Sequence, residues 1–260
     1  MRLAVVIMAL SMTACLADRL LLWPQKARAT PRAESRLLTR PDGALEVIVA
    51  RGDTSVEPEA FVLRFYGNAQ LANDIGYEAA AHGDPRLEWW GVNYPGYGNS
   101  AGPTTLRRLA TAARDAYAAI AKVARGRPII LVGNSMGTVA ALHVAAHERV
   151  AGLILHNPPP LRELILLRHG WYNLWLVAAP VALQLPKALD SLANAAQVRA
   201  PALFLSSSRD AVVPPRFQHK VMRSYAGAWR VLELRGAGHN DALPDWARAA
   251  VADQIRAWSR

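Results

Sequence analysis

The stretch PIILVGNSMG, residues 128–137, carries the signal that decides the fold. Its first half is a short continuous apolar run, which predicts a strand buried on both faces of a sheet. Its second half has the spacing Gly-x-Ser-x-Gly, and an alanine-rich helical segment, 136–146, follows it. A serine between a buried strand and a helix is typical of the sharp turn that exposes a nucleophilic hydroxyl. We therefore predict that Ser135 is a nucleophile.

Short apolar runs and helical segments alternate on both sides of this stretch. We expect strands at 44–50, 61–65, 87–94, 128–132, 150–155, 202–206 and 229–234, and helices at 70–81, 104–124, 136–146, 216–225 and 244–258. Thr104 is a suitable cap for the long helix, and the polar stretch Gln25–Arg40 is interpreted as a connector. The alternation predicts an α/β fold, with a mostly parallel sheet covered by helices on both faces.

Residues 157–194 interrupt the alternation. The segment is too long for an ordinary connection between strand and helix, which spans about 2–6 residues. It begins Asn-Pro-Pro-Pro and is then rich in apolar and aromatic residues, among them Trp171, Tyr172 and Trp175. We interpret it as a small helical cap over one end of the sheet, with these three side chains binding substrate. The alternative is that they only pack on the core.

A serine hydroxyl needs a base and an acid to become a nucleophile. His239 lies in the small-residue loop Gly236–Asn240, directly after the predicted strand 229–234. Asp210 follows the predicted strand 202–206, and the chain order Ser, Asp, His suits a catalytic triad. We predict that Ser135, Asp210 and His239 form one. Asp190 and Asp241 are weaker candidates for the acid, and Asp210 could instead be an exposed partner of Arg209.

Two backbone N–H groups should stabilise the negative oxygen of a tetrahedral intermediate. One is expected from Met136, the residue after the nucleophile, at the positive end of a helix. The other is expected from Tyr66, which follows the predicted strand 61–65. We therefore predict an oxyanion hole formed by the N–H groups of Tyr66 and Met136.

The first 17 residues predict export. Arg2 is followed by an apolar stretch that ends Met-Thr-Ala-Cys, and this stretch is too short for a comfortable membrane span. The pattern resembles a bacterial lipoprotein signal, in which cleavage leaves Cys15 to carry lipid. An uncleaved anchor is the alternative. Either interpretation places residues 18–260 at a membrane surface.

Composition excludes several other classes. The chain has 260 residues, 52% hydrophobic, with a net charge of +10 and one cysteine. This excludes disorder and a disulfide framework. Basic residues are scattered, so no nucleic acid is expected as a partner, and an anionic membrane surface suits the charge better. His143 and His147 lack the glutamate of a zinc helix. We expect no metal and no cofactor, because neither a dinucleotide loop nor a phosphate-binding loop is complete.

The motifs as a set resemble the α/β-hydrolases, and most closely the membrane-tethered branch that includes protein depalmitoylases and many bacterial hydrolases. The resemblance covers Asp18–Trp258. It rests on residues 18–21, 67–69, 94–98, 133–137, Asp210 and 236–240, although Tyr66 stands where that family usually has His or Gly.

The resemblance implies an α/β-hydrolase fold and hydrolysis of an ester or thioester. The expected substrate is a small or lipid-like acyl ester, or an acylated protein. A serine peptidase of the same fold and a non-catalytic lipid-binding protein are the alternatives.

Overall fold

The computed structural model describes residues 17–169, 176 and 178–260. In this part of the chain, eight strands form one sheet in the order β1-β2-β4-β3-β5-β6-β7-β8. The strands are β1 (Glu34–Leu38), β2 (Leu45–Arg51), β3 (Ala60–Phe65), β4 (Leu87–Val92), β5 (Ile129–Asn134), β6 (Gly152–His156), β7 (Ala202–Ser207) and β8 (Trp229–Leu234). β1 and β2 run antiparallel to their neighbours, and the other pairs are parallel. The predicted mostly parallel α/β fold is confirmed.

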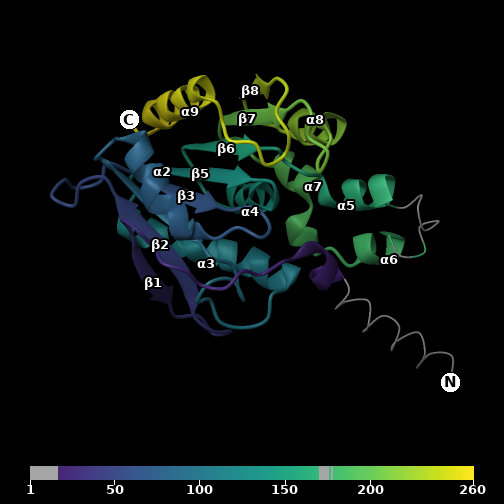
Figure 1. Ribbon diagram of the computed structural model, residues 1–260, viewed down its shortest axis with the longest axis horizontal. Coiled ribbons are helices and arrows are strands. Elements are labelled where there is room, and N and C mark those ends of the chain that lie inside the picture. The colour runs from purple at the N-terminus through teal and green to yellow at the C-terminus, as the bar shows by residue number, and fades with distance from the viewer. Residues whose placement is uncertain (1–16, 170–175, 177) are drawn as a thin grey trace.

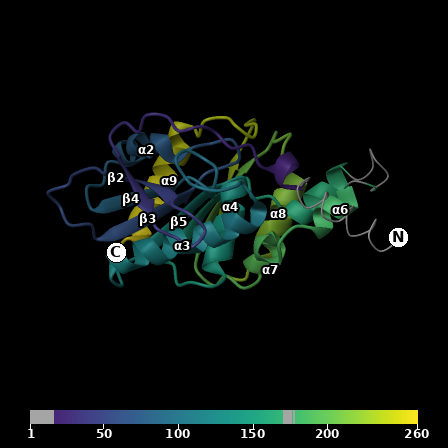
Figure 2. The same cartoon turned by 90° about the horizontal axis from the view of Figure 1, so that it is seen from below.

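Helices cover both faces of the sheet (Figure 2). One face packs on α2 (Ile75–His82) and α9 (Asp245–Trp258), and the other on α3 (Leu106–Ala124), α4 (Met136–Ala145) and α8 (Pro215–Ser224). In β5, Ile129 and Leu131 pack into the core on the face covered by α3, α4 and α8. Ile130 and Val132 pack into the core on the face covered by α2 and α9. Because successive side chains of a strand point to opposite faces, this double burial explains the continuous apolar run.

Short helical segments occupy most of the described chain between β6 and β7. They are α5 (Leu161–Leu164), a π-helical turn (Ile165–His169), α6 (Ala178–Leu183), a 3₁₀ turn (Lys187–Leu189) and α7 (Ser191–Ala195). The Asp190 carboxylate caps α7 by accepting the Ala193 N–H at 3.0 Å. In Figure 1, α5 and α6 lie beyond the carboxyl ends of the parallel strands. This is the segment for which the sequence predicts a cap.

Three local predictions were wrong. The connector Gln25–Arg40 contains β1, an exposed edge strand whose side chains carry no hydrophobic alternation and which is held by backbone pairing with β2. The cap of α3 is Thr105, whose side chain accepts the Arg108 N–H at 3.2 Å. The predicted helix 70–81 starts later, with a 3₁₀ turn at 72–74 before α2.

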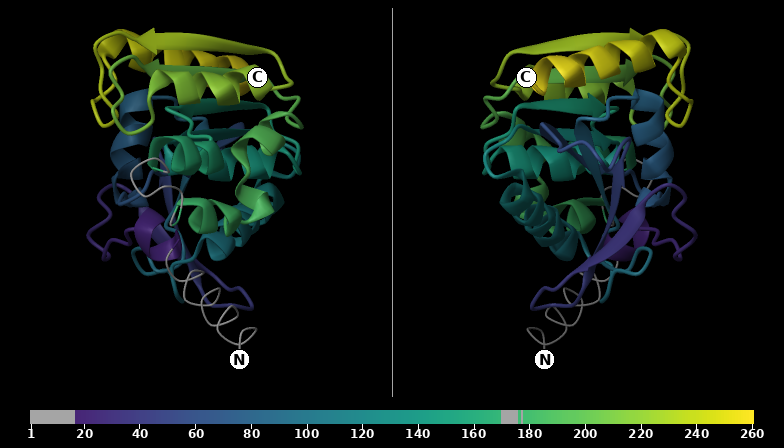
Figure 3. Two further views of the ribbon diagram at one scale, coloured as in Figure 1. Left: turned by 90° about the vertical axis from the view of Figure 1, so that its right-hand side faces the viewer. Right: turned by 90° about the vertical axis from the view of Figure 1, so that its left-hand side faces the viewer.

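The start of the described chain packs against the domain. Ala17 and Leu22 are buried in the core on the α3 side. The Asp18 carboxylate accepts the Leu106 N–H at 2.8 Å, at the beginning of α3. This segment lies at the same end of the molecule as α5 and α6, as Figures 1 and 3 both show.

Candidate active site

Ser135 lies in a strained turn between β5 and α4. Its φ is +50° and its ψ −120°, a backbone conformation that costs about 1–3 kcal/mol and persists only where the surroundings enforce it. Its N–H donates to the His156 carbonyl at 2.8 Å. A β-carbon on Gly137 would lie 2.1 Å from the Phe65 carbonyl oxygen, and one on Gly133 would lie 2.6 Å from the Gly137 carbonyl oxygen. Glycine at both positions therefore lets the turn pack tightly against β3.

The three predicted triad side chains meet at the carboxyl ends of β5, β7 and β8. His239 Nε2 lies 3.0 Å from Ser135 Oγ, and His239 Nδ1 lies 2.7 Å from Asp210 Oδ2. Because a carboxylate only accepts hydrogen bonds, Nδ1 carries the proton and Nε2 is free to accept one from the serine. The arrangement can remove the Ser135 proton and hold the resulting imidazolium.

Asp210 is 4% exposed and is fixed by several donors. Its Oδ1 accepts the N–H groups of Val212 and Val213 at 2.8 and 2.7 Å. Its Oδ2 accepts Nε2 of Gln218 at 3.1 Å, in addition to His239. These contacts hold the carboxylate in one orientation toward the imidazole. Asp210 is thus not the exposed partner of Arg209 that the sequence left open.

Two polar residues near the triad were not found by sequence reasoning. Gln218 is fully buried on α8, and its Nε2 also donates to the Val213 carbonyl at 2.7 Å. Asn157 follows β6, and its Nδ2 donates to the His239 carbonyl at 3.3 Å and to Ser207 Oγ at 3.1 Å. Asn157 has a φ of +52°, and such a residue directly after a buried strand is a signal that could have marked it.

The loop after β3 lies beside the start of α4. The Tyr66 carbonyl accepts the Tyr94 hydroxyl at 3.2 Å, and the Gly67 N–H donates to Gln70 Oε1 at 2.9 Å. Because Gly137 packs on the Phe65 and Tyr66 carbonyls, the Tyr66 and Met136 backbones are neighbours. The two predicted oxyanion donors therefore belong to segments in direct contact.

Four predicted residues lie outside the described part of the chain. They are the proposed substrate-binding residues Trp171, Tyr172 and Trp175, and the proposed lipidation site Cys15. Within the described ranges, no three His, Cys, Asp or Glu side chains are grouped as metal ligands would be. Nor do the described helices include one with the length and apolar character needed to span a bilayer.

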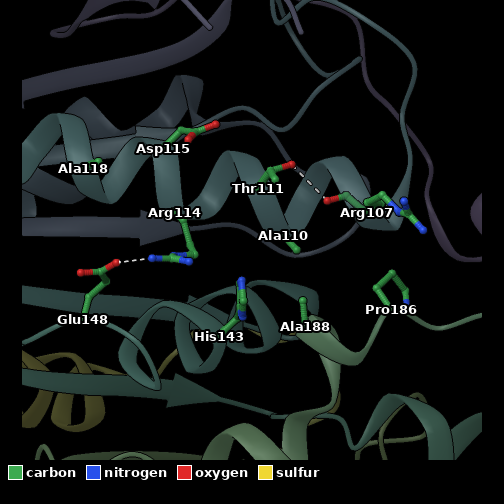
Figure 4. Close-up of a pocket in the computed structure, with 10 residues that line it drawn as sticks. All are labelled: Arg107, Ala110, Thr111, Arg114, Asp115, Ala118, His143, Glu148, Pro186 and Ala188. Carbon is green, nitrogen blue, oxygen red and sulfur yellow. Dashed lines mark hydrogen bonds and ion pairs between the residues drawn. The ribbon is translucent and has the colours of Figure 1, made fainter. Parts of the chain in front are cut away.

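His143 and His147, four residues apart around the end of α4, make a ring contact with each other. Their ring centroids are 4.9 Å apart. His143 also borders a hollow of about 360 Å³ between α3 and α4, shown in Figure 4, where Arg114 and Ala110 face it. Burial, together with His147 and Arg114, lowers the pKa of His143 to about 4. None of the triad residues lines this hollow.

A serine at a strand-to-helix turn, with an imidazole and a carboxylate from the next strand ends, on this sheet order defines the α/β-hydrolase class. Comparison with known proteins agrees. Residues 64–181 match a family model described as "Alpha/beta hydrolase family". Over this segment, which is less than half of the chain, the protein is similar to the α/β-hydrolase family, and its sheet has the α/β-hydrolase fold.

Two curated relatives match part of the chain. It is 28% identical over 169 residues to the alpha/beta hydrolase domain-containing protein aho-3 of Caenorhabditis elegans, covering 64% of this chain and 47% of that protein. It is 26% identical over 171 residues to the uncharacterized membrane protein YNL320W of Saccharomyces cerevisiae, covering 58% and 54%. The chain therefore spans about half the length of the curated relatives it matches.

Solved structures share the fold across nearly the whole chain. The Pyrococcus furiosus esterase Pf2001 superposes with a TM-score of 0.69 at 13% identity, covering 92% of this chain and 97% of that one. A cold-adapted esterase from an Arctic intertidal metagenomic library gives 0.66 at 15% identity, covering 90% and 100%. At these identities the likeness establishes the fold alone.

Proposed function

We propose that the protein is a serine hydrolase that cleaves carboxylic esters or thioesters of an acyl substrate. The observation that carries the proposal is the hydrogen-bonded relay from Ser135 Oγ through His239 to the buried Asp210. The nucleophile and its base lie within hydrogen-bond reach of each other, as general base catalysis requires. Structural neighbours that are esterases make this the favoured chemistry within the family.

The proposed mechanism has two half-reactions. His239 Nε2 takes the Ser135 proton as Oγ attacks the acyl carbon, and Asp210 stabilises the imidazolium. The Tyr66 and Met136 N–H groups meet the negative oxygen of the tetrahedral intermediate. His239 then gives its proton to the departing alcohol or thiol, which leaves an acyl-enzyme. Water, deprotonated by the same imidazole, attacks this ester, and the acid leaves as the proton returns to Ser135.

An apolar acyl group is the favoured substrate part. The described cap is apolar, with Leu161 and Ile165 buried and with Leu167, Leu176 and Leu183 more than half exposed. A peptidase would need charged groups to clamp a peptide terminus, and the segment 157–194 has few. A lipid-binding protein without catalysis would have no use for the strained Ser135 turn or the buried Asp210. We therefore favour medium or long acyl chains over acetate.

Labelling with a fluorophosphonate tests the enzyme against the binding protein. We expect the wild-type protein to be labelled at Ser135 and a Ser135→Ala variant to remain unlabelled. A panel of p-nitrophenyl esters and acyl-thioesters of two to sixteen carbons then measures chain preference. If acetate were the best substrate, the apolar cap would be packing rather than an acyl site.

We further propose that the protein is exported and held at a membrane. Residues 1–17 would act as a signal with lipid on Cys15, or else as an uncleaved anchor. The segment at the start of the described chain lies at the same end of the molecule as α5 and α6 in Figures 1 and 3, and its side chains Leu20 and Trp23 are exposed. The net charge of +10 suits an anionic surface. Intact-mass spectrometry of protein extracted from membranes would distinguish a chain starting at lipid-modified Cys15 from one starting at Met1.

A further inference from the structure

A buried arginine lies behind the strand end that carries the predicted oxyanion donor. Arg64 belongs to β3, and its side chain is 14% exposed. Its Nη1 donates to the Phe65 carbonyl at 3.1 Å and to Asn134 Oδ1 at 3.0 Å. Its Nε donates to Glu78 Oε2 at 3.1 Å, and the guanidinium stacks on the Tyr66 ring at 4.6 Å. The Arg64 guanidinium is thus held by four partners in a largely buried position.

The first contact bears on the oxyanion donor itself. The Phe65 carbonyl and the Tyr66 N–H belong to one peptide group. A hydrogen bond from a cation to the carbonyl draws electron density toward the oxygen and makes the N–H on the other side a stronger donor. Such bonds strengthen one another by about 10–30% in a low-dielectric interior. The Arg64 charge thus reaches the predicted oxyanion hole through a single peptide.

The second contact joins the loop to the nucleophile turn. Asn134 directly precedes Ser135, and its Nδ2 donates to Gln70 Oε1 at 2.8 Å. The same Oε1 accepts the Gly67 N–H at 2.9 Å. One guanidinium therefore links the peptide of Tyr66 with the turn that presents Ser135, and it fixes the distance between donor and nucleophile.

The Arg64 charge also acts across the strand ends. His156 pairs with Asn134 in the register of β5 and β6. Burial first, and then the neighbouring charge of Arg64, lowers the pKa of His156 to about 4, although Asp210 acts in the opposite direction. The Arg64 charge is therefore felt at the end of β6, beside the end of β5 that precedes Ser135.

We propose that Arg64 is a positioning residue that orients and polarises the Phe65–Tyr66 peptide, so that the Tyr66 N–H stabilises the transition state. The role rests on the proposed function. It predicts a specific kinetic effect, because a donor aimed at the oxyanion contributes in the transition state and little in the substrate complex.

The test compares Arg64→Met with a matched control, Arg127→Met. Arg127 stacks on Phe61 of the same strand at 4.9 Å and donates to the Ala124 carbonyl at 2.8 Å, but at the opposite end of β3. Loss of a whole oxyanion donor costs about 10²–10³ in kcat, so a weakened donor should lower kcat about tenfold for the preferred p-nitrophenyl ester. KM should stay within about twofold, because ground-state binding is unchanged.

A trifluoromethyl ketone supplies a readout that a merely structural role would not move. It forms a tetrahedral adduct with a serine and places a negative oxygen in the oxyanion hole. Its Ki should rise in Arg64→Met by the same factor by which kcat/KM falls, and should not rise in Arg127→Met. Arg64→Lys, which keeps the charge but lacks the planar fork, should fall between wild type and Arg64→Met.

Should Arg64→Met fail to fold, the double variant with Glu78→Gln removes both partners of the ion pair, and Arg64→Lys tests the same kinetic ratio. A kcat within twofold of wild type, or an equal loss in Arg127→Met, would overturn the role of Arg64. A wild-type protein with no hydrolysis and no fluorophosphonate labelling would instead contradict the proposed function, and this role with it.

Discussion

The strand-end site and the cap lie at the same end of the molecule but are held in opposite ways. Asp210 is buried and accepts hydrogen bonds from four side-chain or backbone donors. In the cap, Leu176 and Leu183 are 77% and 80% exposed. The polar groups of the strand-end site are fixed by hydrogen bonds, whereas these apolar side chains of the cap are exposed. The contacts that hold the first region lie within the described chain, and the second region is where we propose that a ligand or a membrane binds.

Among the substitutions in the strand-end site, removal of the nucleophile should lower activity the most. Ser135→Ala should lower kcat at least about 10⁴-fold and abolish fluorophosphonate labelling, because triad members act as a unit. The fold should survive, since the hydrogen bond of the Ser135 hydroxyl within the described ranges is to the imidazole of His239. The measurement is ester hydrolysis beside thermal unfolding. Activity within tenfold of wild type would remove Ser135 from the mechanism.

The acid gives the next largest effect. Asp210→Asn should lower kcat by about 10³–10⁴ with little change in KM, because an amide no longer stabilises the imidazolium. Asp190→Asn is the control. Asp190 lies in the segment 157–194, and its carboxylate accepts the Ala193 N–H at the start of α7. It should cost at most about 1 kcal/mol of stability and leave kcat unchanged. The reverse pattern would move the acid to the cap.

The exposed cap surface is tested by vesicle binding. In protein carrying Cys15→Ser, so that lipid on the chain cannot contribute, Leu176→Ser with Leu183→Ser should weaken binding to anionic phospholipid vesicles about five- to thirtyfold. Two leucines that lose part of their burial account for about 1–2 kcal/mol. Leu37→Ser is the control, because Leu37 is similarly exposed but lies on the edge strand β1. Equal binding of both variants would argue against this surface.

The smallest expected effect is on the pH dependence of folding stability, and it comes from His143 on α4. The pKa of His143 is lowered by burial to about 4, below its ordinary value of 6.5. The unfolded chain therefore binds the proton first as the pH falls, and the folded state loses stability between about pH 6.5 and pH 4. At pH 5 the loss from His143 is about 1–2 kcal/mol.

His143→Leu should flatten this acid dependence in urea unfolding measured at pH 5 and pH 7. The partly exposed His219 on α8 provides the control, and His219→Gln should leave the slope as it is in the wild type. An unchanged slope in His143→Leu would show that other groups cause the acid loss.

Local sequence patterns were sufficient where one short segment fixes both structure and role. The apolar run before Gly133 and the glycines around Ser135 predicted β5, the turn and α4 within a residue or two. Prediction failed for β1, because an exposed edge strand needs no apolar face and depends on its neighbour for pairing. It also failed at 70–72, where Gln70 binds the Gly67 N–H instead of entering a helix.

The sequence by itself determined the order of the strands from β2 onward and of the longer helices, the turn at Ser135 and the positions of the base and acid at strand ends. These features follow from short apolar runs, from the spacing of apolar residues and from the glycines at the turn. Each of these signals lies within a few residues of the feature that it predicts. Only the tertiary structure decided which buried polar groups surround them. Gln218 reaches Asp210, Asn157 reaches His239, and Arg64 reaches Asn134. Such contacts join residues from different elements, up to 82 positions apart, and no local pattern records which buried donor will meet which acceptor.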